Sequence, residues 1–268
     1  MGKITAIKKL KRLYRIDLAD FDEEKIYVCE DTLVHFFLNV DKELSESELA
    51  EIKNFDQFAQ GKSLALYYLS FKMRTSSEVR KYLSEHDIND EQIQKVISNL
   101  SENNLINDQF YAENFIDGKI AMGSAGPYQI KQKLLTKGID TDIINEAISR
   151  IYTEEKQIDT AYKLASKIAR TYQQRLTLKQ LKEKIIQNLM NKGFSYSVSS
   201  IALDSLELTI DEENEFDLLY TELDKVAKRY SKNYDGYERK QKITQALARK
   251  GFSYDDISRA IQDYSFPD

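Results

Sequence analysis

Residues 130–151 read IKQKLLTKGIDTDIINEAISRI, and the pattern of this stretch returns at three other places in the chain. Two apolar residues four positions apart lead to a Lys-Gly pair, and an apolar stripe with a spacing of three to four residues follows. The positions equivalent to this glycine are Asp87, Gly138, Gly193 and Gly251, which lie 51, 55 and 58 residues apart. A unit of about 50 residues therefore occurs four times.

Each unit predicts three helices. The apolar residues before the glycine describe a short amphipathic helix, and a glycine just after its end permits a left-handed backbone. Residues that favour the start of a further helix come next: Asn89, Asp140, Ser195 and Ser253. Another helical stripe lies between successive units, as at Leu164, Ala165 and Ile168. Because no single helix can bury its stripe alone, we expect the three helices to pack together.

Residues 1–50 follow a different pattern. Apolar and polar residues alternate around Ile16, around Ile26 and from Val34 to Leu38, which is the periodicity of strands. We therefore expect a three-stranded meander with turns at residues 20–24 and 30–31. A helix that starts in the acidic stretch from Asp41 should lead into the helical part of the chain.

These patterns predict a mainly α protein, namely an elongated tandem array of three-helix bundle repeats with a small N-terminal antiparallel β element. The expected divisions are residues 1–50 for the β element and 51–110, 111–153, 154–210 and 211–268 for the four helical repeats.

The composition favours a binding protein over an enzyme. A single cysteine excludes a disulfide framework and a thiolate metal cluster, and two histidines in separate predicted elements give no zinc pair. The glycine-containing stretch 122–126 lacks the Lys-Ser or Lys-Thr of a phosphate-binding loop. We expect no catalytic residues, metal or cofactor. No apolar run approaches the length of a membrane helix and no signal peptide is evident, so a cytoplasmic protein without membrane contact is expected.

Basic residues are concentrated locally although the net charge is −5. Residues 160–203 contain eight basic residues against one acid, Glu183, and residues 1–16 contain six basic residues and no acid. Such zones attract phosphates or acidic protein surfaces, while a lysine that faces water on a helix also serves solubility alone.

Several short motifs resemble those of the RecX regulatory proteins of bacteria. The most specific is Gly126-Pro127, followed by Ile130, Leu134 and Lys137-Gly138-Ile139. The others are Ile106-Asn107-Asp108, Tyr111-Ala112, and Ala65, Leu69, Arg74, Ser76, Glu78, Val79 and Leu83. The similarity covers residues 61–264 approximately, and the N-terminal extension with an additional C-terminal unit is similar to the longer form found in Gram-positive bacteria. The chain departs from the family at Phe110, Asp117 and Gly118, where arginines are common.

The resemblance implies a protein that binds the RecA recombinase filament on single-stranded DNA. It implies inhibition of RecA ATP hydrolysis, strand exchange and coprotease activity, and so a role in recombination, DNA repair and the SOS response. Helix geometry and charge suggest contact residues on or just after the helix that precedes Asp87, Gly138 or Gly193 in the first three units. These candidates are Arg80, Lys81, Lys131, Lys133, Lys137, Lys179, Lys182, Lys184 and Lys192.

Two other functions fit the same helices. Three short helices also describe a helix-turn-helix module, which would bind single-stranded or double-stranded DNA directly. The expected last helices carry few of the basic or amide side chains that base readout requires, and residues 195–206 carry no basic residue. A scaffold that recruits another partner is the third possibility. A monomer is expected, since the chain has no unpaired apolar heptad.

Overall fold

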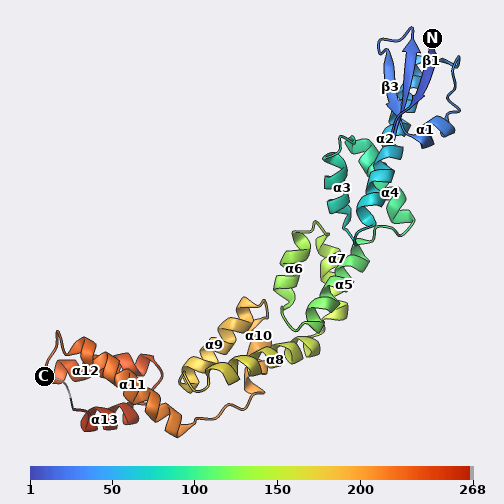
Figure 1. Cartoon of the computed structure of the whole chain (residues 1–268). Coiled ribbons are helices and arrows are strands. Elements are labelled where there is room, and N and C mark those ends of the chain that lie inside the picture. The colour runs from blue at the N-terminus through green and yellow to red at the C-terminus, as the bar shows by residue number, and fades with distance from the viewer. Residues whose placement is uncertain (266–268) are drawn as a thin grey trace. The chain divides into compact units, whose positions relative to one another are not determined.

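A computed structural model describes residues 1–265 of the chain. Its N-terminal part is a four-stranded antiparallel sheet with the strand order β3-β2-β1-β4. Figure 1 shows this sheet in blue, with β1 and β3 labelled. The strands are β1 (Gly2–Lys9), β2 (Tyr14–Ala19), β3 (Lys25–Val28) and β4 (Glu43–Leu44). The short helix α1 (Glu30–His35) follows β3, and the long helix α2 (Glu46–Leu69) follows β4.

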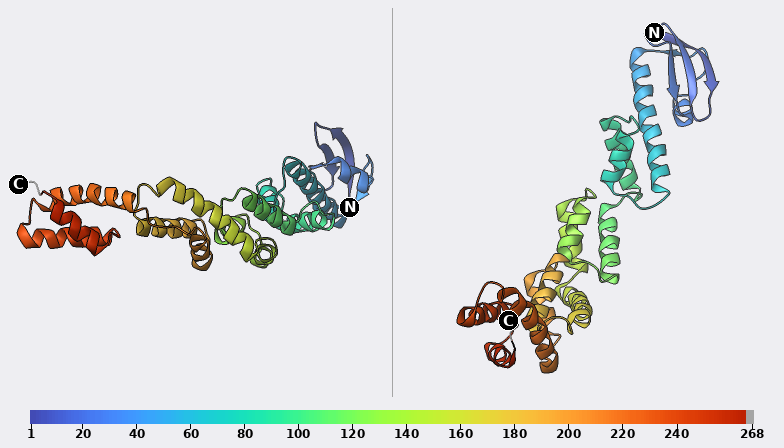
Figure 2. Two further views of the ribbon diagram at one scale, coloured as in Figure 1. Left: turned by 90° about the horizontal axis from the view of Figure 1, so that it is seen from below. Right: turned by 60° about the vertical axis from the view of Figure 1, so that its left-hand side comes forward.

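Alternating apolar residues bury one face of this sheet against α2. Ile4, Ile16 and Val28 come from three different strands and pack in one cluster with Leu49 and Ile52 of α2. Figure 2 shows the first half of α2 alongside the sheet. A sheet of this size has little stability alone, so the helix supplies the surface that it needs.

The predicted third strand at residues 34–38 is wrong, because residues 30–35 form α1. The backbone amide of Cys29 and the hydroxyl of Thr32 each donate to Oδ1 of Asp56 at 2.7 Å, so a carboxylate of α2 fixes the start of α1. The turn expected at residues 30–31 is therefore helical, whereas the turn at 20–24 is confirmed. The remaining strand of the meander is β1, a strand that was not predicted from the sequence.

Three helices recur in each of the four repeats, as predicted (Figure 1). We call them the leading, middle and last helix. The leading helices are α2, α5 (Asp108–Ala121), α8 (Glu154–Tyr172) and α11 (Glu212–Tyr230). The middle helices are α3 (Ser76–Ser84), α6 (Pro127–Leu135), α9 (Leu178–Asn191) and α12 (Gly236–Arg249). The last helices are α4 (Asp90–Glu102), α7 (Thr141–Ile151), α10 (Tyr196–Asp204) and α13 (Tyr254–Asp263).

The predicted start and stop signals of the helices are confirmed. The side chains of Asn89, Ser195 and Ser253 each accept a hydrogen bond from the third backbone amide of the last helix that they precede. The positions after the middle helices have a left-handed backbone, with φ of 60° at Asp87 and 74°, 91° and 103° at the three glycines that share its place in the pattern.

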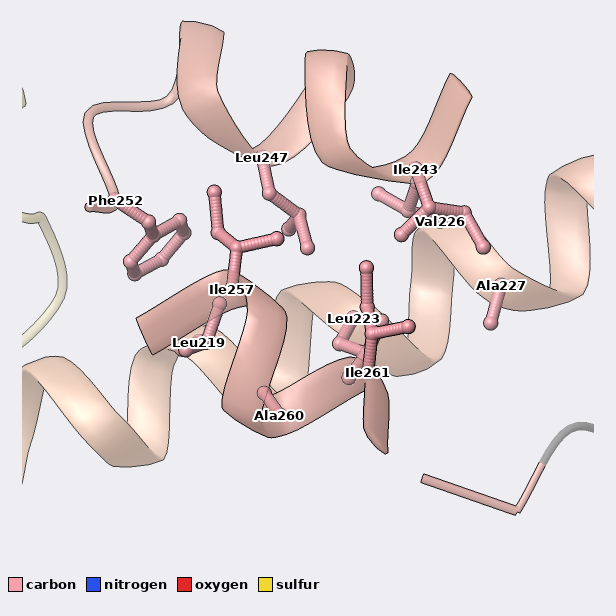
Figure 3. Packing of buried hydrophobic residues seen from close by; sticks show 10 residues of the cluster. All are labelled: Leu219, Leu223, Val226, Ala227, Ile243, Leu247, Phe252, Ile257, Ala260 and Ile261. Carbon is pink, nitrogen blue, oxygen red and sulfur yellow. The ribbon is translucent and has the colours of Figure 1, made fainter. Parts of the chain in front are cut away.

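The fourth repeat shows how a bundle buries its apolar stripes. Leu219 and Leu223 of α11 meet Leu247 of α12 and Ile257 and Ile261 of α13, all within one cluster (Figure 3). Every helix of the repeat contributes to this core and none could bury its stripe without the other two. In the first repeat, Ala65, Val79, Leu83, Ile93 and Val96 form the corresponding cluster.

By contacts between Cα atoms the chain divides into two compact units. The first contains Met1–Asn114 and Leu134–Ile144, and the second contains Phe115–Lys133 and the chain from Asn145 onward. The predicted limits of the five divisions stay predictions; helix α2 crosses the limit at residue 50 and α5 crosses the limit at 110. The last division includes residues 266–268, which lie outside the described residues. Within residues 1–265, no helix has the length and apolar character that crossing a membrane would require.

Candidate interaction surface

Polar contacts join each middle helix to the middle helix of the next repeat. At the first of these repeat joints, the hydroxyl of Thr75, which caps α3, donates to the carbonyl oxygen of Lys137 at 2.8 Å. The ammonium of Lys137 pairs with Glu78 in the first turn of α3 at 2.7 Å. The end of one middle helix therefore lies against the start of the preceding one.

The two charged groups of this first joint, the carboxylate of Glu78 and the ammonium of Lys137, stabilise each other. Partial burial alone would raise the pKa of Glu78, but the hydrogen bonds from Lys137 and from the backbone amide of Thr75 lower it below its ordinary value. The same contact raises the pKa of Lys137, chiefly through its hydrogen bond to Glu78. Both groups are therefore held in their charged forms at neutral pH.

The second joint repeats this arrangement with backbone groups in place of a hydroxyl. The amide of Gly126, which occupies the position equivalent to Thr75, donates to the carbonyl oxygen of Lys192 at 2.7 Å. The amide of Tyr128 donates to Gly193 at 3.1 Å, and the side chain of Gln129 donates to the carbonyl of Asn191 at 2.6 Å. No charged side chain takes part in these contacts.

At the third joint, a threonine hydroxyl again makes the contact between middle helices. The hydroxyl of Thr177, the cap of α9, donates to the carbonyl oxygen of Lys250 at 2.9 Å. The ammonium of Lys250 pairs with Glu222 of α11, a carboxylate whose pKa is lowered by its lysine partners against the opposing effect of burial. The backbone amide of Leu178 donates to Glu215, also of α11, at 2.6 Å.

The joints explain why the recurring residue is glycine. A Cβ atom on Gly138 would lie 2.3 Å from Oγ of Ser77, one on Gly193 would lie 2.5 Å from the amide nitrogen of Gln129, and one on Gly251 would lie 2.8 Å from Cβ of Lys179. Each glycine thus combines a left-handed backbone with close approach of the preceding repeat. The equivalent position of the first repeat has no preceding repeat, and Asp87 occupies it with its side chain exposed.

The structure distributes the nine candidate contact residues over different environments. Lys137 is committed to the first joint. Arg80 donates to Gln94 at 2.7 Å and Lys131 to Asn145 at 2.8 Å, equivalent contacts from a middle helix to the last helix of the same repeat. Lys81 lies 3.9 Å from Glu85 in an exposed pair. The side chains of Lys133 and Lys192 are exposed.

The three lysines of α9 do not share one face. Lys179 and Lys182 line a groove of about 430 Å³, together with Ile210 and Asp256. The ammonium of Lys184 instead lies over the ring of Tyr172 in α8, 4.4 Å from its centroid. Lys182 also borders a second groove of about 460 Å³ with the apolar side chains Ile186, Met190, Tyr196 and Leu203. Of the three candidates on α9, Lys179 and Lys182 are thus the two that are exposed and line the same groove.

The joints between repeats were not among the features predicted from the sequence. Their signal was present, because the Lys-Gly pair occurs only in the three repeats that follow another repeat. Among residues 1–265, no group of three or more potential ligands from histidine, cysteine, aspartate and glutamate is placed to hold a metal ion. Cys29 is half-buried, and burial raises the pKa of its thiol.

Family models of the RecX three-helix domains match most of the helical chain. The model of the first domain matches residues 62–100, and that of the second matches residues 107–148. The model of the third domain matches twice, at residues 154–203 and 212–261. The fourth repeat is thus a second copy of the third type.

Full-length relatives carry the same family name. The regulatory protein RecX of Lactococcus lactis subsp. cremoris (strain SK11) is 78% identical over 269 residues and matches over all of both chains. The regulatory protein RecX of Streptococcus gordonii is 48% identical over 263 residues, which are 98% of this chain and 99% of that one.

Solved structures agree with this relationship. A crystal structure of regulatory protein RecX has a TM-score of 0.62 and 35% identity, covering 76% of this chain and 100% of that chain. The crystal structure of RecX from Lactobacillus salivarius has a TM-score of 0.55 and 35% identity, covering 57% of this chain and 99% of that chain. The chain described here therefore belongs to the RecX family of regulatory proteins.

Proposed function

We propose that this protein regulates RecA by binding the filament that RecA forms on single-stranded DNA. Bound there, it inhibits RecA ATP hydrolysis, strand exchange and coprotease activity, and it acts as a cytoplasmic monomer without a catalytic group or cofactor of its own. The observation that carries the proposal is the 78% identity, along the entire chain, to a protein named regulatory protein RecX.

The tandem repeats suit a partner that is itself repetitive. Each repeat has its own three-helix composition and its own exposed basic residues, so several repeats can each contact a RecA protomer. Once one contact has formed, the linked repeats meet their sites at a high effective concentration. Individually weak contacts then suffice for stable binding.

We assign the main filament contact to Lys179 and Lys182. Both are exposed, both line the same groove, and neither has an ion-pair partner in the described part of the chain. Lys137 has a different role, because its ammonium is held by Glu78. The exposed ammonium groups of these two lysines attract acidic groups on a partner surface and oppose basic ones.

Charge reversal tests this assignment. The double variant Lys179→Glu/Lys182→Glu should need on the order of tenfold more protein for half-inhibition of RecA ATP hydrolysis, since like charges across an interface oppose association. The matched control is Lys163→Glu/Lys167→Glu, which reverses two exposed lysines of α8. Circular dichroism should show both variants folded. Equal inhibition by the two variants and the wild type would remove the α9 groove from the interface.

A helix-turn-helix reader of DNA sequence is not favoured by the last helices. Their basic residues are few: Lys95 of α4 is paired with Glu91 at 2.7 Å, α7 and α13 carry one arginine each, and α10 carries no basic residue. Specific readout in the major groove depends on such side chains. We therefore place the regulatory contact on the middle helices.

A further inference from the structure

A second basic surface lies in the fourth repeat, where α11 ends and α12 begins. We call residues 228–242 the α11–α12 tip (orange in Figure 1). It contains six basic residues, Lys228, Arg229, Lys232, Arg239, Lys240 and Lys242. It contains only two acids, Asp235 and Glu238, and three tyrosines, Tyr230, Tyr234 and Tyr237.

Three lysines of the tip are available to a ligand. Lys228, Lys232 and Lys240 are exposed and have no ion-pair partner among residues 1–265. The neighbouring lysines behave differently, because Lys225 and Lys250 both pair with Glu222. Within the described residues, the repeat thus pairs Lys225 and Lys250 with a carboxylate and leaves the three exposed lysines of the tip without one.

The six basic residues differ in their relation to the helix dipoles. Lys228 and Arg229 lie in the last turn of α11, which favours cations, whereas three others lie near the N-terminus of α12. The first two turns of α12 carry Arg239, Lys240 and Lys242 beside one acid, Glu238, although the N-terminus of a helix favours negative charge. The leading helix of the same repeat follows the usual preference, with Glu212, Glu213 and Glu215 in its first turn. Asp235, the residue before α12, makes no side-chain hydrogen bond to the first backbone amides of this helix. An anion placed here would meet both the amides and the cations.

Two tyrosines of the tip contact each other and its cations, and the third is exposed. The ring centroids of Tyr230 and Tyr234 lie 5.9 Å apart, with Arg229 5.7 Å from the first and Lys242 5.6 Å from the second. Tyr237, in the first turn of α12, is 82% exposed. A large exposed aromatic ring beside free lysines is the combination that binds unpaired bases and their phosphates.

We propose that the α11–α12 tip binds single-stranded nucleic acid. Lys228, Lys232 and Lys240 contact phosphates, and the ring of Tyr237 stacks on a base. A duplex keeps its bases stacked on each other, so the exposed ring selects single strands. This site needs no RecA, and it differs from the filament contact on α9.

Binding of fluorescently labelled oligothymidylate to the purified full-length protein alone, followed by fluorescence anisotropy, tests the proposal. The variant Lys228→Gln/Lys232→Gln/Lys240→Gln should bind much more weakly, and the slope of log affinity against log salt should fall by about 2, since each single-strand phosphate contact adds about 0.7. The control variant Lys25→Gln/Lys72→Gln/Lys95→Gln removes the same charge from exposed lysines elsewhere and should bind like the wild type.

Tyr237 separates stacking from simple charge attraction. Tyr237→Ala should weaken oligothymidylate binding by about tenfold, and Tyr237→Phe should restore it, because base stacking needs the ring and not the hydroxyl. Duplex DNA of the same length should bind more weakly than the single strand and should be insensitive to Tyr237→Ala. Oligouridylate should bind like oligothymidylate, because neither phosphate nor ring contact distinguishes the sugar.

Three results would overturn the proposal. The first is oligothymidylate binding that is undetectable in the wild type or unchanged in the triple tip variant. The second is an equal effect of Tyr237→Ala on single-stranded and duplex DNA. The third is equally tight binding of polyglutamate, which would assign the tip to an acidic protein surface. None of these results depends on RecA, so the proposed regulation stands or fails separately.

Discussion

At the scale of single residues, Gly138 satisfies two requirements that any other residue would violate. Its φ is 74°, and Ser77 of the preceding repeat occupies the space where a side chain would begin. Gly193 and Gly251 meet the same two requirements at the other joints. Each recurring glycine thus marks both the end of a helix and a close contact with the preceding repeat.

Substitution by alanine separates these two requirements. Gly123→Ala carries only the left-handed backbone cost of about 1 kcal/mol, since its φ is 56° and no atom lies within 4 Å of a new Cβ. Gly138→Ala adds the collision with Ser77 and should cost about 2 to 3 kcal/mol in the free energy of unfolding. Urea denaturation followed by circular dichroism measures both variants. An equal loss of stability in Gly123→Ala and Gly138→Ala would show that Ser77 moves away from the new Cβ atom at no cost.

The Glu78–Lys137 pair makes the first joint sensitive to acid. The pKa of Glu78 is lowered in the folded protein, so its stabilising contribution is present above the ordinary value of 4.5 and is lost as the pH falls through the lowered value. The contribution is about 1 kcal/mol or less, because Lys137 is 39% exposed and solvent screens the pair.

Glu78→Gln tests this dependence, since glutamine keeps a capping side chain at the third position of the helix without the charge. Between neutral pH and about pH 3, the wild type should lose its stability advantage over Glu78→Gln. The exposed pair of Lys81 and Glu85 provides the control, because Glu85→Gln should match the wild type across the titration. If the difference in the free energy of unfolding between the wild type and Glu78→Gln did not change with pH, the ion pair would not stabilise the first joint.

At the scale of elements, the helices could be predicted because their signals are local. Apolar spacing, a capping side chain and a glycine lie within one stretch of chain, as at Ile185, Gly193 and Ser195. Helix α1 could not be predicted in this way, because Asp56 reaches the start of the helix from α2. The alternation from Val34 to Leu38 resembles a strand, and this long-range hydrogen bonding overrides it.

The caps of the last helices provide a direct test at this scale. Ser195 accepts a hydrogen bond from the amide of Val198 at 3.2 Å. Ser195→Ala should lower the free energy of unfolding by about 1 kcal/mol, and Ser195→Asp should retain the cap and most of the stability. Thermal unfolding followed by circular dichroism compares the two variants. Equal losses would show that the side chain at this position does not cap α10.

At the scale of the whole molecule, each repeat depends chiefly on its own core. Leu247 is fully buried among residues of α11, α12 and α13 (Figure 3), so Leu247→Ala should cost the fourth repeat about 3 kcal/mol. Hydrogen exchange should quicken within residues 212–263 and stay unchanged within residues 76–102. Leu105→Ala removes the same atoms from a half-exposed side chain and should change exchange little. Uniform acceleration along the chain would contradict independent cores.

The surfaces of the molecule were harder to predict than its helices. The charge count predicted a basic surface in residues 160–203. In the structure, however, Lys184 lies over the ring of Tyr172, and only Lys179 and Lys182 line the groove. Lys137 fits a basic face by its spacing, but its partner Glu78 belongs to another repeat. Whether a charged side chain is free depends on contacts between repeats, which the pattern of one repeat does not contain.

The most direct test of the proposed function is RecA ATP hydrolysis on single-stranded DNA, measured while this protein is titrated in. A regulator that acts on the filament should suppress hydrolysis at ratios far below one molecule per RecA protomer, because each bound molecule affects several protomers. Unchanged hydrolysis with the protein in excess over RecA would contradict the account.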